Sequence, residues 1–393
     1  MLTLIFIASL ILLAYFRCKF VYWAITFIIF AVASTNMLCF IGAILVAIIG
    51  LVRPLRQLVT WPIYFLVIKL ELMPNISATE QAALDAGNTW LEADFFTGIP
   101  NFKQALALDL PSLTVAEQVF LDTKVDTLCA MVNDWQVQQQ RDLPQAAWDY
   151  IKKEKFFGLI VPKKYGGLEF SALAQSKIVA KIASRCPVMA ITVMVPNSLG
   201  PAELLKEYGT PEQQDYYLPK LAIGQEIPCF GLTELNAGSD ASSIEAHGEL
   251  FKEGDKLYIK LNFAKRWITL SGIASVIGLA FKLYDKDNLL GKSKDLGISI
   301  ALLSSDTKGI DVTQRHDPMG VPFYNCPIIG KDVIIPADNL IGGIDRAGQG
   351  WNMLMECLAA GRAISLPAIS LGGAKLLANV TGKHAFIREQ FGL

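Results

Sequence analysis

The first 52 residues are almost uniformly apolar and carry only two charges, Arg17 and Lys19. The apolar segment 2–16 is short for a membrane span, because crossing a bilayer takes about 20 residues. The segment 21–52 has no charged residue. Its length is more than one ordinary transmembrane helix needs and less than two such helices need. The polar residues 34–36 interrupt it and fit a tilt, a kink or a tight hairpin. The pattern predicts one or two transmembrane helices, with two favoured.

A cleaved signal peptide is the alternative, but its first part should be positive, and residues 1–11 contain no Lys or Arg. Arg53, Arg56 and Lys69 follow the apolar segment. Positive residues prefer the cytoplasmic side of a membrane, which predicts an inner-membrane location with the rest of the chain facing the cytoplasm. The apolar and aromatic segment 57–70 suits either an interfacial anchor or a connector packed on the next domain.

Helical periodicity dominates from residue 71 to 225. The segment 77–87 begins with a capping box formed by Ser77 and Glu80, and apolar residues recur at helical spacing through 114–140. The capping box and the helical periodicity predict a helical domain that covers residues 71–225.

The pattern changes at about residue 226, where short β-rich segments follow one another and are separated by Gly, Asp and Asn turns. Strands in succession favour a barrel or sandwich over a doubly wound parallel sheet. Helical periodicity returns after residue 346. The predicted class is therefore α+β, with membrane segments at 1–70, helices at 71–225, a β domain at 226–345 and an incomplete helical domain at 346–393.

Composition removes several classes of function. The net charge of −1 offers no basic surface for nucleic acid. Seven cysteines without CxxC spacing argue against a disulfide framework and a zinc site, and the three histidines lack metal-ligand spacing. The sequence "GKS" at 291–293 has Lys286 where a phosphate-binding P-loop needs glycine. A G-x-G-x-x-G dinucleotide motif and a G-x-S-x-G nucleophile elbow are also missing from the sequence.

Two segments remain as candidates for chemistry, "CFGLTELNAGSDASSI" at 229–244 and "KRWITLSGIAS" at 265–275. The first has a turn around Gly238 whose closely spaced N–H groups suggest an anion-binding nest. The second places Trp267 beside the hydroxyl of Thr269, a combination that suits a planar ring with polar edges. A core tryptophan and an ordinary surface turn explain the same residues, and the residues alone leave both interpretations open.

The two segments resemble a known family. "LTELNAGSDASSI" is similar to the TEP-AGSD signature of acyl-CoA dehydrogenases, and "RWIT" is similar to their second flavin segment. The apolar N-terminus, "KKYGGLEFSALAQSK", "VPNSLGPAELL" and "GQGWNMLMECLAAGRAISLP" resemble the long, membrane-associated bacterial FadE type. Leu235 stands where many relatives have proline, which should change the rigidity of the turn more than its ligand.

The resemblance implies an FAD-dependent enzyme of fatty acid β-oxidation. Such an enzyme removes an α-proton and a β-hydride from a fatty acyl-CoA and passes electrons to an electron-transfer flavoprotein. Trp267, Ile268 and Thr269 would flank the isoalloxazine, with Thr269 near its N5 atom. The other FAD-lining residues would be Phe230, Gly231, Leu232, Thr233, Glu234, Leu235, Asn236, Ala237, Gly238 and Ser239.

Further roles come from the same resemblance. Arg362 would meet the CoA portion of the substrate, where a guanidinium suits phosphate, and Ser239 would also face the substrate. Arg388, Glu389 and Gln390 match a segment that reaches the FAD of a neighbouring subunit, which implies a homo-oligomer in the full-length protein.

A catalytic base is not identified. Most relatives place a glutamate in the last helical domain, beyond the position of Leu393, and a minority place it at the position of Gly361. Glu356 lies about 140° around the same predicted helix and is expected to be a solvated or packing residue, while Glu234 and Asp240 are expected to be structural. We therefore expect a C-terminally truncated dehydrogenase. An inactive membrane-associated fragment and an acyl-CoA oxidase are the alternatives.

Overall fold

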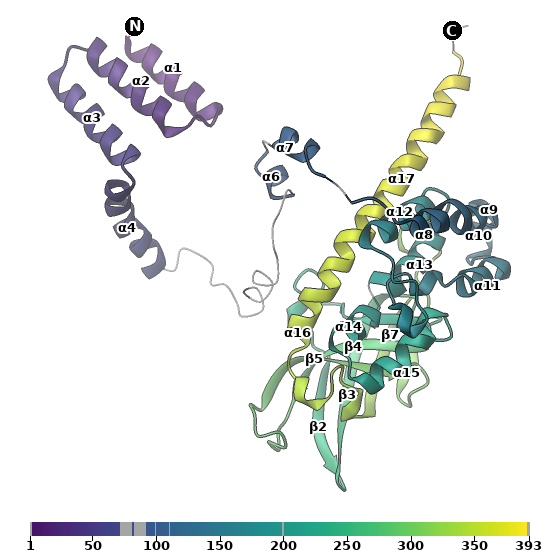
Figure 1. The fold of residues 1–393 in the computed structure, drawn as a ribbon. Coiled ribbons are helices and arrows are strands. Elements are labelled where there is room, and N and C mark those ends of the chain that lie inside the picture. Colours follow the sequence, from purple (N-terminus) through teal and green to yellow (C-terminus); the bar gives the residue numbers. More distant parts are fainter. Residues whose placement is uncertain are drawn as a thin grey trace. The chain divides into compact units, whose positions relative to one another are not determined.

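The computed structural model describes residues 2–70, 81, 92–98, 100–109, 111–198 and 200–390 (Figure 1). The chain divides into two compact units, Met1–Ser77 and Ala78–Leu393. The predicted capping box of Ser77 and Glu80 lies outside the described residues.

Within residues 2–70, the described part of the first unit, there are four helices: α1 (Leu2–Tyr15), α2 (Phe20–Ala33), α3 (Met37–Leu51) and α4 (Arg53–Lys69). The break between α2 and α3 falls at the polar residues 34–36, where Thr35 adopts a left-handed conformation and the side chain of Asn36 caps α3. Alanines are the buried residues of α2 and α3. Small side chains let two apolar helices approach closely, so residues 34–36 form a turn between two packed helices.

The helices of the first unit are short for a bilayer. α1 and α2 have 14 residues each, about 21 Å of helix against a hydrocarbon core of about 30 Å. α3 and α4 are long and apolar enough to cross a membrane only when they are counted together as one span, and the pair is bent by 88° at the break between them. None of the side chains of α4 is buried. Two longer apolar segments belong to the second unit, and in one of them, Pro187–Tyr208, 88% of an apolar 18-residue window is buried, as expected of helices in a protein core.

The second unit begins with a helical layer. The predicted helix at 114–140 is divided: a capping box of Thr114 and Glu117 starts it, and Asn133 caps a new helix after a break. The elements are α6 (Glu92–Phe96), α7 (Phe102–Leu106), α8 (Val115–Val119), η1 (Phe120–Lys124), α9 (Val125–Ala130), α10 (Asp134–Gln140), α11 (Gln145–Lys153), α12 (Ala172–Ala183), α13 (Pro187–Ser198), α14 (Ala202–Tyr208) and α15 (Pro211–Ala222).

Seven strands follow and form one sheet in the order β1-β4-β2-β3-β7-β6, with β5 beside β4. The pairs of β4 with β1 and β2 are parallel and the others are antiparallel. The strands are β1 (Pro228–Gly231), β2 (His247–Glu253), β3 (Lys256–Thr269), β4 (Val276–Tyr284), β5 (Asp295–Ser304), β6 (Ile310–Val312) and β7 (Asn325–Pro336). The predicted succession of strands between two helical regions is confirmed.

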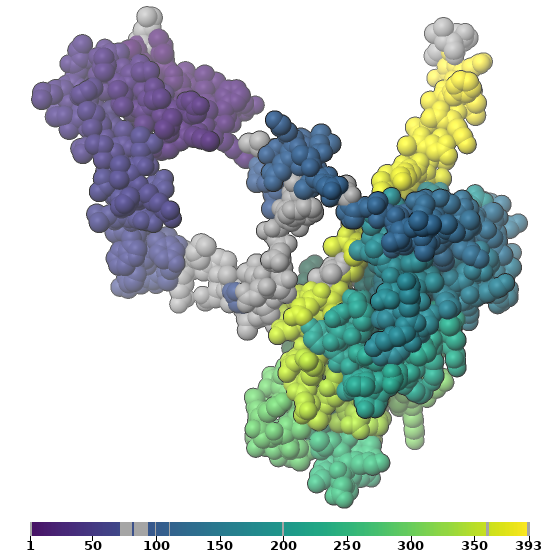
Figure 2. Space-filling model, viewed as in Figure 1, coloured from purple at the N-terminus to yellow at the C-terminus, as the bar shows by residue number. Residues whose placement is uncertain are grey.

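The last helices are α16 (Gly350–Met353), η8 (Leu354–Leu358) and α17 (Ala359–Ile387). The first half of α17 packs on the helical layer: Gln175 of α12 donates hydrogen bonds to the Asn197 carbonyl of α13 (3.0 Å) and to Ser365 Oγ of α17 (3.2 Å). At Gly361 the contact with α13 is so close that a Cβ atom would lie 2.3 Å from the Ser198 carbonyl oxygen. The second half of α17 extends away from the helical layer (Figure 2).

Candidate functional site

A pocket of about 130 Å³ lies where α13, β1, the end of β3 and the start of α17 meet. Side chains that are far apart in the sequence share its wall. Its lining consists of Val195, Phe230, Leu232, Thr233, Trp267, Ile268, Thr269, Leu358 and Arg362. The structure therefore brings the two candidate segments together and adds Arg362 to them. Val195 and Leu358 were not predicted, because no local pattern in the sequence identifies them.

The backbone of β3 is irregular where it reaches the pocket. Pairing with β7 shifts register between Lys265 and Ile268, and Trp267 within this bulge has a left-handed φ of +64°. Bulges redirect side chains and are common beside functional sites, and a bulky residue with positive φ is unusual. The result is an indole that is 52% exposed next to the pocket instead of packed in the sheet.

A buried ion pair supports the turn that follows β1. Lys265 is 1% exposed, and its Nζ donates to the Leu232 carbonyl (2.9 Å) and to Glu234 Oε1 (2.6 Å). Glu234 also accepts hydrogen bonds from the backbone N–H groups of Glu245 (2.6 Å) and Ala246 (3.0 Å). Burial lowers the pKa of Lys265 to about 8, although Glu234 opposes the shift. The pair fixes the backbone at Leu232, one residue before Thr233 of the pocket.

The rest of the turn lies outside this pocket. Leu235, Asn236, Gly238 and Ser239 are exposed, whereas Gly231 and Ala237 are buried. Residues 231–240 contain no positive φ, so the alternating right- and left-handed backbone of one kind of nest is not formed there. Asp240 accepts hydrogen bonds from Ser243 and Ser242, which lower its pKa.

Arg362 and the segment 388–390 occupy opposite ends of α17. Arg362 is exposed at the edge of the pocket, and desolvation lowers its pKa, although a guanidinium remains charged near neutral pH. Arg388, Glu389 and Gln390 follow the end of the helix. They lie 26 or more residues from Arg362, about 39 Å along a helix, and cannot line this pocket.

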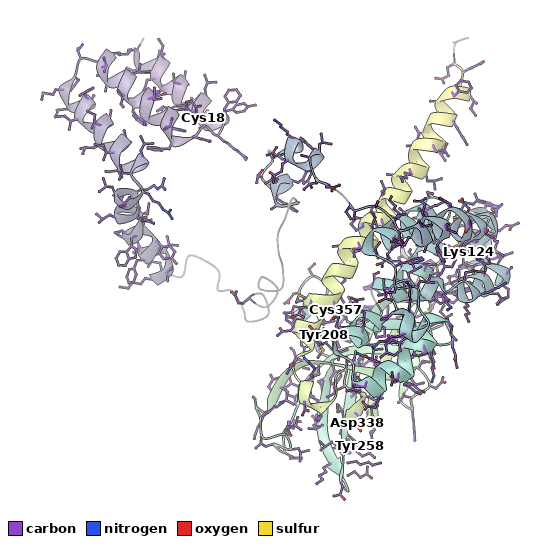
Figure 3. All side chains as sticks on the ribbon, in the orientation of Figure 1. Cys18, Lys124, Tyr208, Tyr258, Asp338 and Cys357 are labelled. Carbon is purple, nitrogen blue, oxygen red and sulfur yellow. The ribbon has the colours of Figure 1, made fainter. Side chains whose placement is uncertain are left out.

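The pocket lining contains no carboxylate among the described residues. Glu356 lies in η8, is exposed and accepts a hydrogen bond from Tyr208. Figure 3 labels Tyr208 close to Cys357, the residue that follows Glu356. A second cavity of about 280 Å³, between α12, α13, α14 and α17, includes Glu169 and Glu203 in its lining. Neither residue belongs to the lining of the first pocket.

Comparison with known proteins identifies the family. Residues 114–225 match the acyl-CoA dehydrogenase N-terminal domain, and residues 229–333 match the acyl-CoA dehydrogenase middle domain. The two matches together include more than half of the chain. The chain belongs to the acyl-CoA dehydrogenase family.

Two curated relatives whose names include acyl-CoA dehydrogenase agree with this assignment, and a third relative carries a different name. The chain is 31% identical to the probable acyl-CoA dehydrogenase YngJ of Bacillus subtilis over 65% of this chain and 64% of that protein. It is 31% identical to the probable acyl-CoA dehydrogenase FadE10 of Mycobacterium tuberculosis over 60% and 35% of the two chains. A stretch of 103 residues is 52% identical to Protein HemX of Proteus mirabilis, over 26% of this chain and 61% of that protein.

The structure of butyryl-CoA dehydrogenase from Megasphaera elsdenii superposes with a TM-score of 0.63 at 25% identity, over 73% of this chain and 72% of that one. The acyl-CoA dehydrogenase from Geobacillus kaustophilus gives 0.62 at 25% identity, over 72% of each chain. The predicted fold class is confirmed. The chain spans less than two thirds of the length of each curated relative named above.

Proposed function

We propose that this chain belongs to a membrane-associated, FAD-dependent acyl-CoA dehydrogenase that converts a fatty acyl-CoA to a trans-2-enoyl-CoA. One observation carries the proposal: separate elements bring Thr233, Trp267, Thr269 and Arg362 into a single pocket. These are residues for which resemblance to the family implies contact with flavin or with acyl-CoA. Electrons would pass to an electron-transfer flavoprotein, as in the family.

The chemistry of the lining fits a flavin ring. The half-exposed indole of Trp267 offers an aromatic face, and Phe230 and Leu232 add apolar wall. The hydroxyls of Thr233 and Thr269 can hydrogen-bond the polar edge of a ring. A bound flavin supplies the hydride acceptor. Arg362 would orient the phosphate-bearing part of the substrate, which a guanidinium binds well.

Flavin binding by the intact chain tests this proposal. The detergent-solubilised 393-residue protein, titrated with FAD, should gain bound flavin with a perturbed visible spectrum. Trp267→Ala should weaken FAD binding about tenfold, the loss expected for removing about 1.4 kcal/mol of aromatic stacking. Trp135→Ala is the matched control, because Trp135 is exposed on α10, outside the pocket. Absence of FAD binding by the wild-type chain contradicts the proposal.

A second candidate is a catalytically inactive membrane-associated fragment that retains the flavin pocket. It is favoured by the pocket lining, which lacks a carboxylate that could remove the weakly acidic α-proton of a thioester. Long-chain acyl-CoA should bleach the flavin of an active dehydrogenase and leave that of an inactive fragment unchanged. Release of hydrogen peroxide on substrate addition would instead identify an oxidase.

The first unit supports a location at the membrane. α1–α4 expose many large apolar side chains. Arg53 and Arg56 lie in the first turn of α4, the helix that follows α3, and such positive residues favour the cytoplasmic side of the inner membrane for the remainder of the chain. Membrane fractions should retain the chain after an alkaline carbonate wash, whereas a chain that begins at residue 78 should be released. The homo-oligomer expected of the full-length protein is tested by its mass in detergent.

A further inference from the structure

Asn325 lies directly behind a residue of the proposed flavin pocket. It is 2% exposed at the start of β7 and is the cross-strand partner of Thr269 on β3. Its Nδ2 donates to Thr269 Oγ1 at 3.4 Å, a long hydrogen bond. Its Oδ1 is buried without a hydrogen-bond partner among the described residues.

His316 contacts Trp267, another residue expected to flank the flavin ring, and is hydrogen-bonded to Asn325. Its backbone N–H donates to the Asn325 carbonyl at 2.7 Å. Its imidazole contacts the indole of Trp267, with 4.8 Å between ring centroids and 45° between the planes. The Nε2 atom of His316 is also buried without a partner among the described residues. The two residues therefore contact Thr269 and Trp267 from outside the pocket lining.

The segment that carries His316 is tied to the helical layer. Arg315 donates from one guanidinium nitrogen to the carbonyls of Arg141 (2.7 Å) and Pro322 (2.6 Å). The Tyr324 hydroxyl donates to Asp142 Oδ2 at 2.7 Å. Both Arg141 and Asp142 follow α10 directly. These contacts give the segment a fixed support independent of the sheet.

The direction of the bond to Thr269 has a chemical consequence. A hydroxyl has one hydrogen to donate and two lone pairs that accept. Because the Asn325 amide donates to the oxygen, the hydroxyl hydrogen of Thr269 is left for an acceptor elsewhere. Oxidised flavin offers acceptor nitrogens and oxygens along its polar edge, and reduced flavin carries hydrogen on one of those nitrogens. A fixed donor at Thr269 therefore favours the oxidised ring.

We propose that Asn325 and His316 are positioning residues of this site: Asn325 directs the hydroxyl of Thr269 toward the ring, and His316 holds the indole of Trp267 against it. The inference rests on the proposed binding of FAD. A purely structural role explains Asn325 poorly, because a buried amide with one long hydrogen bond and an unpartnered oxygen is replaced by an apolar residue of similar shape at little cost.

The variant Asn325→Leu distinguishes a positioning role of Asn325 from a purely structural one. It should leave the urea unfolding midpoint of the flavin-free chain unchanged or higher, and it should weaken binding of oxidised FAD about tenfold. Binding of reduced FAD should change little, so the midpoint potential of bound FAD should rise by about 30 mV, the two-electron equivalent of a tenfold change. In a Thr269→Val background the same substitution should have no further effect on FAD. If Asn325→Leu does not fold, Asn325→Ser, whose side chain is too short to reach, carries the same expectation.

His316→Leu gives the second arm. It should weaken FAD binding several-fold in the wild-type chain and should have no further effect in a Trp267→Ala background. If the wild-type chain takes up no FAD, the proposed function fails and the inference fails with it. If the wild-type chain binds FAD and the variants match it in affinity and potential, the inference alone is overturned. The inference is also overturned if Asn325→Leu weakens FAD binding equally with and without Thr269→Val, or if His316→Leu does so with and without Trp267→Ala. Equal losses of FAD affinity would indicate a structural effect.

Discussion

Removing the charge of Lys265 is expected to destabilise the β domain far more than removing a surface lysine. Lys265→Met keeps the length and apolar character of the side chain but deletes the ammonium. The Leu232 carbonyl and Glu234 Oε1 then lose a donor that lies at 2.9 Å and 2.6 Å, respectively. Both groups belong to buried residues, since Leu232 is 6% and Glu234 7% exposed.

The size of the effect depends on this burial. Deleting one partner of a buried ion pair costs about 3 to 5 kcal/mol, because the other charge remains buried. Glu234 keeps two backbone donors, Glu245 N–H and Ala246 N–H, so about 3 kcal/mol is expected. Lys286→Met is the matched control. Lys286 pairs with Glu249 while 64% of its side chain is exposed, and exposed pairs contribute about 0 to 1 kcal/mol.

Urea unfolding of the detergent-solubilised chain, followed by tryptophan fluorescence, measures both variants. With a slope of about 1 to 3 kcal/mol/M, a loss of about 3 kcal/mol lowers the midpoint for Lys265→Met by about 1 M or more. The double variant Lys265→Met, Glu234→Leu removes both charges and should recover much of the loss. The reasoning is refuted if Lys265→Met and Lys286→Met lower the midpoint equally.

The contacts of single residues give three further predictions. Burial raises the pKa of Glu117, but hydrogen bonds from Ser171 and Thr114 outweigh it and lower the pKa from 4.5 to about 2. The ionised Glu117 therefore stabilises the fold fully above pH 4.5, and this stabilisation is lost as the pH falls toward 2. In acid unfolding, Glu117→Gln should lose less stability across that pH window than the wild type. Gly361→Ala should cost about 1 to 3 kcal/mol in urea unfolding, because its Cβ would lie 2.3 Å from a backbone oxygen. Asn133→Ala removes the cap of α10 and should cost about 1 kcal/mol, whereas an unchanged unfolding midpoint would show that the cap contributes nothing.

The order of helices, strands and helices could be predicted because periodicity is a local property. A period of 3.6 or 2 is visible within a few residues, and each region keeps one period over many residues. Boundaries inside a region were less accurate. The helical periodicity over 114–140 is interrupted at residues 131–133, where Asn133 caps a new helix.

The pocket could be predicted only in part. Trp267 and Thr269 form a recognisable local motif, but Val195 and Leu358 reach the same pocket from helices that are distant in the sequence. The burial of Lys265 does have a signal in the sequence. Leu261, Phe263 and Lys265 alternate along β3 and are all buried, so period-2 alternation places this lysine on the core face. A lysine on a core face requires a carboxylate partner, and Glu234 in the neighbouring candidate segment supplies one.

Gly361 occupies the position at which the family resemblance implies a carboxylate in a minority of relatives, and the structure explains why the residue here is small. α17 crosses α13 at Gly361 and Ser198, where a Cβ atom would overlap the Ser198 carbonyl oxygen. A larger residue would have to push the two helices apart, and both helices contribute to the pocket wall, through Val195 of α13 and Arg362 of α17. Gly361 therefore lets α13 and α17 approach closely enough for both helices to line the pocket.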